Sequence, residues 1–209
     1  MSYLIGLNGR AGAGKDTACG FIKEWGEEHG YTVKREAFAD RLKLSAARTF
    51  FPEIKMEDAV AWCNEFKVFG RVGVQIGGDG PFALSGDISG REFLQRYGTE
   101  AHREVFGQSF WIDAALQDVS ADILVVTDAR FANEAEAIRV RGGWVWEIVR
   151  PGHDLTDTSH PSEQRLDETL IDLSIVNHSD LSVLRMHVFQ ALNHWVTRVG
   201  SVFAGRIVS

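Results

Sequence analysis

The chain has 209 residues, which is enough for one α/β domain with a sizeable hydrophobic core. Its formal net charge of -7 argues against a protein that coats nucleic acid, although a small anionic ligand needs only a local positive pocket. The two cysteines, Cys19 and Cys63, form no C-x-x-C pair, so neither a disulfide scaffold nor a zinc site is indicated. We find no signal peptide and no apolar run of membrane-spanning length, and we therefore expect a cytoplasmic protein.

Residues 9–17 follow a short apolar run of strand type and precede a helical pattern. Gly9 and Gly14-Lys15 have the spacing G-x-x-x-x-G-K of a phosphate-binding loop. The glycines let backbone N–H groups turn toward an anion, the helix start adds partial positive charge, and Lys15 adds a full charge. The alternative is a glycine-rich turn that only caps the helix. The pattern predicts that nucleotide phosphates bind to Gly9, Arg10, Ala11, Gly12, Ala13, Gly14, Lys15, Asp16 and Thr17.

The residue after the lysine departs from the usual pattern. A Ser or Thr there would hold magnesium, but this chain has Asp16, with Thr17 one place later. A carboxylate can serve magnesium directly or through water, although it also places negative charge near the phosphates. Asp16 and Thr17 are therefore both candidate magnesium ligands.

A second strand is predicted over residues 31–38, and a helix follows it toward Phe50. In open parallel sheets, ligands bind at the carboxyl ends of the strands. Asp40, Arg41 and Lys43 therefore stand where a second substrate could bind. The alternative is that Asp40 caps the helix and the two basic residues are only solvated.

The middle of the chain contains two further helical patterns, over residues 53–69 and from Gly90 to about Val105, the second capped by Ser89. Residues 70–90 hold seven glycines and fit either a small hairpin or a mobile flap. The second helix carries a polar row at four-residue spacing, which spans ~18 Å, so its ends cannot both contact one phosphate. This row consists of Arg91, Gln95, Thr99 and Arg103.

Residues 122–128 form the clearest buried strand, because a continuous β-branched run suits a parallel sheet that is covered on both faces. The strand ends in Asp128-Ala129-Arg130. An aspartate at the end of an apolar strand, downstream of a phosphate-binding loop, is how such enzymes reach a magnesium ion. The alternative is that Asp128 caps the helix predicted over residues 133–140.

The last third of the chain predicts a strand over residues 144–149 and another over 170–176 that ends at Asn177. Between them, after Arg150, residues 151–169 have the polar, Pro- and Gly-punctuated composition of a lid. A final helix follows. Five strand candidates alternate with helices, so we predict one α/β domain over residues 1–209 with a five-stranded parallel sheet and helices on both faces.

The chain resembles the deoxynucleoside monophosphate kinases of bacteriophages, in the P-loop nucleoside monophosphate kinase superfamily, over nearly its whole length except residues 70–90. The departures are Ala129, where Val is more usual, and Ala132, where Pro is common. Phosphomevalonate kinases share the Gly-Lys-Asp loop, and dephospho-coenzyme A kinases share the ending 172–177. The resemblance rests on the stretches 9–17, Phe38-Ala39-Asp40-Arg41-Leu42-Lys43, 90–95, 98–100, Phe110-Trp111, 127–134, Gly142-Gly143, 150–152 and 160–163.

This resemblance implies a P-loop kinase fold and transfer of the γ-phosphoryl of ATP to a deoxynucleoside 5'-monophosphate, giving the diphosphate and ADP. An acceptor phosphate with a second pKa of ~6 is mostly dianionic at pH 7, so no general base is needed. The residues that would act in catalysis are Lys15, Asp128, Arg130 and Arg150. Asn177 would lie beside the adenine, and magnesium would be bound by Asp16, Thr17 or Asp128. The acceptor would bind in a helical region of about residues 39–120, to Phe38, Asp40, Arg41, Lys43, Arg91, Gln95, Thr99, Arg103 and Trp111.

For Phe38 and Trp111, core packing explains the residue as well as stacking on a base does. Two other functions stay open at this point: a kinase of another small phosphorylated acceptor, and a non-catalytic nucleotide-binding switch. The expected cofactors are ATP and Mg²⁺, and the expected partners are small nucleotides rather than nucleic acid polymers or membranes. A homodimer is compatible with the resemblance, and the compartment would be the host cytoplasm if the protein is viral.

Overall fold

The computed structural model describes residues 3–76, 84–117, 120–152, 166–178 and 180–204. The chain forms two compact units. One, which we call the sheet unit, consists of Met1–Glu36 and Asp118–Ser209; the other, the inserted unit, is Ala37–Gln117. Most of the lid expected at about residues 151–169 lies outside the described residues.

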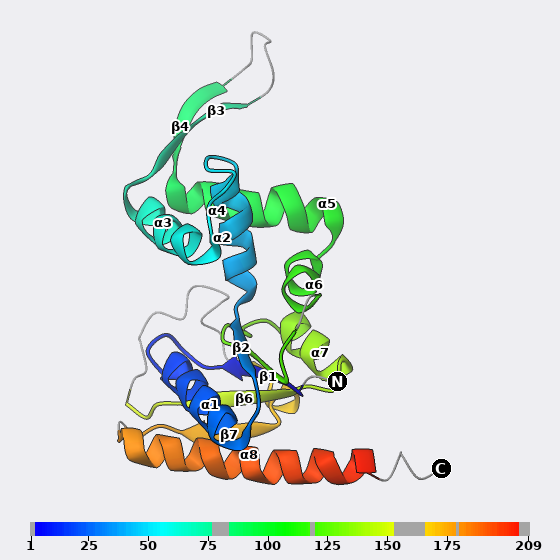
Figure 1. The fold of residues 1–209 in the computed structure, drawn as a ribbon. Helices are drawn as coiled ribbons and strands as arrows, with labels where there is room; N and C mark the ends of the chain where they lie inside the picture. The colour runs from blue at the N-terminus through cyan, green and yellow to red at the C-terminus, as the bar shows by residue number, and fades with distance from the viewer. Residues whose placement is uncertain (1–2, 77–83, 118–119, 153–165, 179, 205–209) are drawn as a thin grey trace. The chain divides into compact units, whose positions relative to one another are not determined.

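The sheet unit contains a five-stranded sheet in the order β2-β5-β1-β6-β7, and every pair of neighbouring strands is parallel (Figure 1). The parallel sheet predicted from the sequence is therefore confirmed. All four residues of β5 are buried, as its continuous apolar run requires. The strands are β1 (Tyr3–Asn8), β2 (Val33–Glu36), β5 (Ile123–Val126), β6 (Trp144–Val149) and β7 (Leu173–Val176).

One face of this sheet packs against α1 (Lys15–His29) and α8 (Leu181–Ala204). The core between them is built around three tryptophans, Trp25, Trp146 and Trp195, each at most 2 % exposed. Because side chains alternate along a strand, Ile5 and Leu7 of β1 face this core while Gly6 faces the opposite side.

The opposite face of the sheet is covered by α7 (Ala132–Val140), which contacts β1 and β6. A Cβ atom on Gly6 would lie 2.4 Å from Ile138 Cδ1, so the glycine allows this helix to approach the strand closely. Helices therefore lie on both faces, as predicted. A short 3-10 helix, η3 (Glu168–Leu170), precedes β7.

The inserted unit is mostly helical and carries one antiparallel pair of strands, β3 (Arg71–Ile76) and β4 (Leu84–Ser89). Of the two structures that fit residues 70–90, the hairpin is thus observed, with its turn at 77–83 outside the described residues. The helices are α2 (Phe38–Arg48), α3 (Met56–Phe69), α4 (Gly90–Gly98), the π-helical turn η1 (Thr99–Arg103), α5 (Glu104–Phe106) and α6 (Phe110–Leu116).

The helix predicted from Gly90 to about Val105 forms, but it is not a regular α-helix throughout. Its predicted cap is confirmed, because Ser89 Oγ accepts a hydrogen bond of 3.2 Å from the Glu92 backbone N–H. After Gly98 the chain takes one π-helical turn before it returns to α geometry. Hydrophobic periodicity does not distinguish such a turn from a continuous helix.

Two glycines fix the base of the hairpin against α3. The Gly90 N–H donates to Gly70 O at 2.8 Å, so the chain leaves and returns at one point. A Cβ atom on Gly90 would lie 1.9 Å from Phe66 O, which no other residue could tolerate. None of the helices in the described ranges combines the length and apolar character that a membrane crossing requires.

Candidate active site

The loop between β1 and α1 has a backbone that requires its glycines. Gly9, Gly12 and Gly14 have φ values of 140°, 73° and 104°, which L side chains rarely adopt. A Cβ atom on Gly9 would lie 2.5 Å from Ile148 O, and one on Gly14 would lie 2.6 Å from Asn177 Nδ2. The two glycines of the sequence spacing, Gly9 and Gly14, and also Gly12 therefore occupy backbone positions that other residues would fill only with strain.

The loop lies where the order of the strands changes direction. After β1 the chain goes outward to β2 and returns to β5 beside β1, and it then crosses to β6 and β7 on the other side. Ligands of open α/β sheets bind at such switch points, at the carboxyl ends of the strands. Helix α1 begins at Lys15, so the N–H groups of its first turn and its partial positive charge add to the same place.

The Lys15 side chain folds back over this loop. Its Nζ donates hydrogen bonds to Gly9 O at 2.6 Å and to Arg10 O at 2.9 Å. The ammonium group is therefore held at the loop backbone, where the N–H groups and the helix start also place positive charge. The arrangement suits an anion with several oxygens, such as a chain of phosphates.

Two residues that follow β6 and β7 also reach the loop. Arg150, which follows β6, donates to Gly12 O at 3.3 Å, and Asn177, which follows β7, donates from Nδ2 to Ala13 O at 2.8 Å. The Asn177 side chain is buried, and its backbone N–H is bonded to Val149 O at 2.7 Å. The structure thus brings two predicted site residues, distant in sequence, to the loop between β1 and α1.

The turn after β5 holds Asp128 between two fixed neighbours. The Thr127 N–H donates to Glu36 O at 3.0 Å, and Ala129 O accepts from Asn8 Nδ2 at 2.8 Å. Asn8 is the last residue of β1, directly before the loop, so it ties the Asp128 turn to the loop strand. Asn8 was not predicted from the sequence; its only signal is a polar residue at the end of an apolar strand.

The Glu134 side chain folds back onto the backbone that precedes α7. Glu134 Oε2 accepts hydrogen bonds from the N–H groups of Arg130 and Phe131 at 2.8 and 3.1 Å. Phe131 occupies the N-cap position and has no side-chain acceptor, so the reciprocal half of a capping box is absent. Glu134 therefore satisfies two N–H groups just before the helix, and the role of Asp128 stays a prediction.

The two candidate magnesium ligands on α1 are exposed. The Asp16 side chain is 83 % exposed, and its Oδ1 lies 3.6 Å from Arg35 NH2 on β2. An ion pair this exposed adds little to stability, but it offsets the negative charge that Asp16 brings to the loop. Thr17 is also exposed on the first turn of the helix.

In the inserted unit, the predicted acceptor residues divide by burial. Asp40 is buried and accepts a charge-assisted hydrogen bond of 3.3 Å from Lys43 Nζ within α2. Phe38 and Trp111 are 2 % and 3 % exposed, which favours the packing explanation that the sequence left open for them. Among the rest, Arg91, Gln95 and Thr99 are exposed, whereas Arg41 and Arg103 are partly buried.

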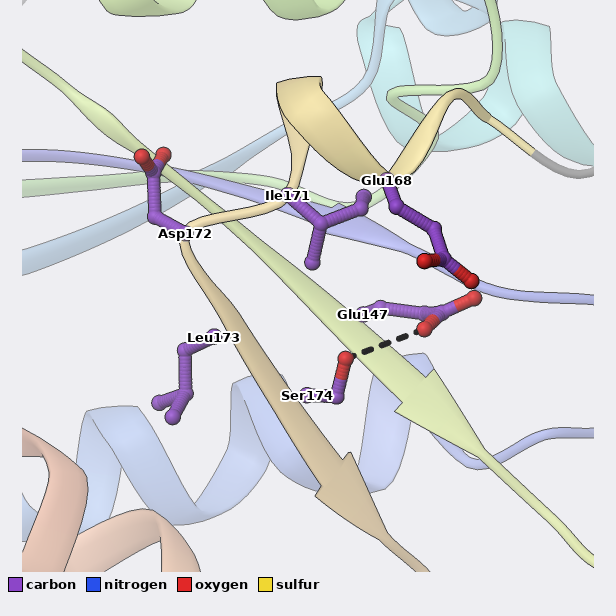
Figure 2. A pocket seen from close by; sticks show the side chains of 6 residues that line it. All are labelled: Glu147, Glu168, Ile171, Asp172, Leu173 and Ser174. Carbon is purple, nitrogen blue, oxygen red and sulfur yellow. Dashed lines mark hydrogen bonds between the residues drawn. The ribbon is translucent and has the colours of Figure 1, made fainter.

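A separate pocket of about 380 Å³ lies in the sheet unit near β6 and β7 (Figure 2). Glu147 is buried and accepts from Ser174 Oγ at 3.1 Å, and Figure 2 shows the Glu168 carboxylate pointing toward that of Glu147. Three carboxylates would repel a phosphate, so this pocket is not the phosphate site. Its lining residues are Glu147, Glu168, Ile171, Asp172, Leu173 and Ser174.

The described part of the chain contains no preformed cluster of metal-binding side chains. There, no group of three or more His, Cys, Asp or Glu side chains is placed to hold an ion. In the pocket, Asp172 is engaged elsewhere: it accepts from the Val145 N–H at 2.8 Å and lies 3.5 Å from Arg139 Nε.

Two curated viral proteins are similar to this chain over most of their length. One, from Acanthamoeba polyphaga mimivirus, is provisionally named a deoxynucleotide monophosphate kinase; it is 27% identical over 205 residues, which covers 91% of this chain and 96% of that protein. The other is the deoxynucleoside-5'-monophosphate kinase of Escherichia phage T5, 24% identical over 240 residues, with 90% of this chain and 95% of that protein covered.

The family described as deoxynucleotide monophosphate kinase matches residues 79–188, which is more than half of the chain. The match includes the turn after β5 and the ends of β6 and β7, from which Asp128, Arg150 and Asn177 extend. The glycine loop at the switch point lies outside the matched range and supports the same class independently. The chain belongs to the deoxynucleotide monophosphate kinase family.

Proposed function

We propose that this protein transfers the γ-phosphoryl group of ATP to a deoxynucleoside 5'-monophosphate, producing the diphosphate and ADP. The observation that carries the proposal is the loop at residues 9–14, with its three glycines at positive φ, on the switch point of the sheet. This loop and Lys15 form a site for the phosphates of the donor nucleotide. The names of the two viral relatives support the choice of acceptor.

The donor phosphates would bind to the loop N–H groups and to Lys15. The ammonium group now bonded to Gly9 O and Arg10 O would turn toward a phosphate oxygen, which is a stronger acceptor because it is charged. Arg150 and Asn177 hold the loop carbonyls and keep the N–H groups facing the other way. Arg150 would also contact the transferring group, and Asn177 would border the adenine.

Magnesium would be held by Asp128, Asp16 or Thr17 together with nucleotide phosphates and water. These oxygen donors suit a small hard cation that keeps part of its hydration shell. Asp128 fits this role because its turn is fixed on both sides, by Thr127 and Ala129, at the carboxyl end of β5. When bound, the ion would neutralise part of the charge on the β- and γ-phosphates.

The acceptor would bind to the helical region of about residues 39–120. No general base is required, since a phosphate monoester with a second pKa of ~6 is already a dianion for most of the time at pH 7. The protein therefore contributes positioning and positive charge. Phe38 and Trp111 would support this region from its core. The polar groups proposed to contact the acceptor are Asp40, Arg41, Lys43, Arg91, Gln95, Thr99, Arg103 and, after β5, Arg130.

We further propose that the protein works on free nucleotides rather than on nucleic acid polymers or membranes. Its net charge of -7 disfavours binding to a polyanion. The compartment proposed is the cytoplasm, that of the host if the gene is viral, and a homodimer is compatible with this function.

The test is ADP release from ATP and magnesium with a panel of acceptors. The panel holds the four deoxynucleoside monophosphates, their ribose counterparts, phosphomevalonate and dephospho-coenzyme A. We expect turnover with at least one deoxynucleotide, at a kcat/KM at least ~10-fold above that of its ribose analogue, a difference of ~1.4 kcal/mol. Activity only on the non-nucleotide acceptors would overturn the proposed acceptor. Tight ATP binding without activity on any acceptor would instead indicate a nucleotide-dependent switch.

A further inference from the structure

The polar row of the inserted unit ends in the π-helical turn Thr99–Arg103. The Glu104 N–H at its end donates to Thr99 O, five residues back, whereas an α-helix pairs residues four apart. Turns of this kind are rare, and they frequently occur at functional sites. Nothing in the proposed reaction yet explains why this turn is present.

Two side chains donate hydrogen bonds to consecutive carbonyls where the turn begins. His102 Nδ1 lies 2.5 Å from Tyr97 O, and Trp111 Nε1 donates to Gly98 O at 3.0 Å. Because a carbonyl oxygen can only accept, Nδ1 of His102 carries the proton. A widened turn disturbs the regular backbone ladder at this point, and these two donors supply hydrogen bonds there.

The imidazole of His102 is held on several sides by aromatic rings. Its centroid lies 4.4 Å from that of Tyr97, 4.8 Å from Trp111 and 5.2 Å from Phe110. Below the turn, a Cβ atom on Gly98 would lie 2.2 Å from a methyl carbon of Leu42, so only glycine lets the helix approach α2 this closely. The turn is therefore a fixed feature of the unit's packing.

The turn changes the direction of Arg103 relative to the rest of the row. In an α-helix each residue advances ~100°, so a four-residue step overshoots a full turn by ~40°, and three steps would carry Arg103 ~120° away from Arg91. A π-helical turn holds more than four residues, so the step from Thr99 to Arg103 stops short of a full turn. Arg103 is thereby rotated back toward the line of the row.

We propose that His102 is a positioning residue for the acceptor nucleotide. By donating to Tyr97 O it holds the π-helical turn, and the turn sets the direction in which Arg103 extends from the helix. This inference rests on the proposed function, in which the row of Arg91, Gln95, Thr99 and Arg103 contacts the acceptor.

The primary test compares His102→Phe, which keeps a ring but removes the donor, with His102→Asn, whose amide nitrogen can donate from the position of Nδ1. Steady-state kinetics are measured with the acceptor and ATP varied separately. We expect His102→Phe to raise the KM of the deoxynucleotide ~10-fold and leave the KM of ATP unchanged, and His102→Asn to restore most of the loss. Glu100→Gln, an exposed change in the same turn, is the matched control and should behave as wild type.

The variant Arg103→Ala separates this inference from the proposed function. The double variant combines Arg103→Ala with His102→Phe. If His102 acts through Arg103, the KM of this double variant for the acceptor should be no higher than that of Arg103→Ala alone, because the two changes remove one interaction. If Arg103→Ala raises the KM of the acceptor but His102→Phe does not, or if the two effects multiply, the inference about His102 is wrong while the acceptor site stands. If Arg103→Ala leaves that KM unchanged, the proposed contact of Arg103 is wrong and the inference falls with it.

A folding defect in His102→Phe would not end the test. His102→Leu removes the same donor with a more flexible side chain, and the same comparison applies to it. A folded His102→Leu variant with a wild-type KM for the acceptor would overturn the proposal.

Discussion

The sheet unit and the inserted unit hold their candidate site residues in different ways. In the sheet unit the site is largely backbone: the loop at 9–14 takes its shape from three glycines, and Arg150 and Asn177 bind its carbonyls. In the inserted unit the candidates are side chains along helices, and the direction of Arg103 depends on a π-helical turn. A backbone site should therefore tolerate fewer substitutions than a row of side chains, whose members can be lost one at a time.

The largest effect is expected at Lys15. Lys15→Ala should lower kcat by ~10²–10³ without unfolding the protein, since it removes a charge that stabilises the transferring phosphoryl group. The matched control is Lys23→Ala, an exposed lysine on the same helix whose ion pair with Glu27 measures 3.9 Å. A folded Lys15→Ala enzyme with near-normal turnover would refute the role of the loop as the donor site.

A glycine of the loop tests the backbone directly. Gly9→Ala should destabilise the protein by ~1–3 kcal/mol, because its φ of 140° and its contact with Ile148 O are both incompatible with a Cβ atom. Gly20→Ala on α1, where a Cβ would meet nothing within 4 Å, should instead stabilise it by ~0.5–1 kcal/mol. Urea unfolding measures the change in the free energy of unfolding for both variants. Equal changes would show that the backbone at Gly9 does not require a glycine.

Asp128 and Glu134 separate magnesium binding from helix capping. Asp128→Asn should lower kcat and raise the magnesium concentration for half-maximal activity by ~10-fold. Glu134→Gln should weaken the cap of α7 and lower stability by ~1 kcal/mol, but leave the magnesium titration unchanged. If Asp128→Asn gives the wild-type titration curve, Asp128 is not a magnesium ligand.

The smallest expected effect is a difference in the alkylation rates of two buried cysteines, one in each unit. Burial raises the pKa of the Cys19 thiol to about 11 and also raises the pKa of the Cys63 thiol. At pH 8 only ~0.1 % of Cys19 is thiolate, so its alkylation should be slow and accelerate ~10-fold per pH unit until the pH nears that pKa. We expect Cys63 to react faster although both thiols are buried, because the described core cluster around it is smaller than that around Cys19 and should open more readily. Mass spectrometry resolves the sites, and faster labelling of Cys19 would contradict this ranking.

The sheet could be predicted from the sequence because each of its strands has a local pattern of apolar and β-branched residues. The β-branched run of β5 and the bounds 144–149 of β6 follow from composition alone, and so does the end of α1 at Gly30, whose φ is 76°. Strand β2 is shorter than the predicted 31–38, since α2 begins at Phe38. The order of the strands follows from right-handed connections only once the elements are known.

Other parts of the site could not be predicted, because they depend on distant partners. Asn8 binds a carbonyl 121 positions away, and no local pattern indicates that bond. The π-helical turn comes with hydrogen bonds from His102 and Trp111 to carbonyls of α4, while the sequence pattern indicates a continuous helix. The glycine spacing succeeded because it encodes backbone torsion angles directly, whereas these features arise from tertiary packing.

The hydrogen bond between the Gly90 N–H and Gly70 O has a use in protein engineering. It brings the two ends of the β3–β4 hairpin together, so the hairpin begins and ends at one point between α3 and α4. Grafting an epitope or a fluorescent reporter onto the far end of this hairpin should change little of the path that the two helices follow, whereas Ile88 near its base is buried. The hairpin is therefore a suitable site for such insertions, provided that Gly70 and Gly90, which pack against Phe66, are kept.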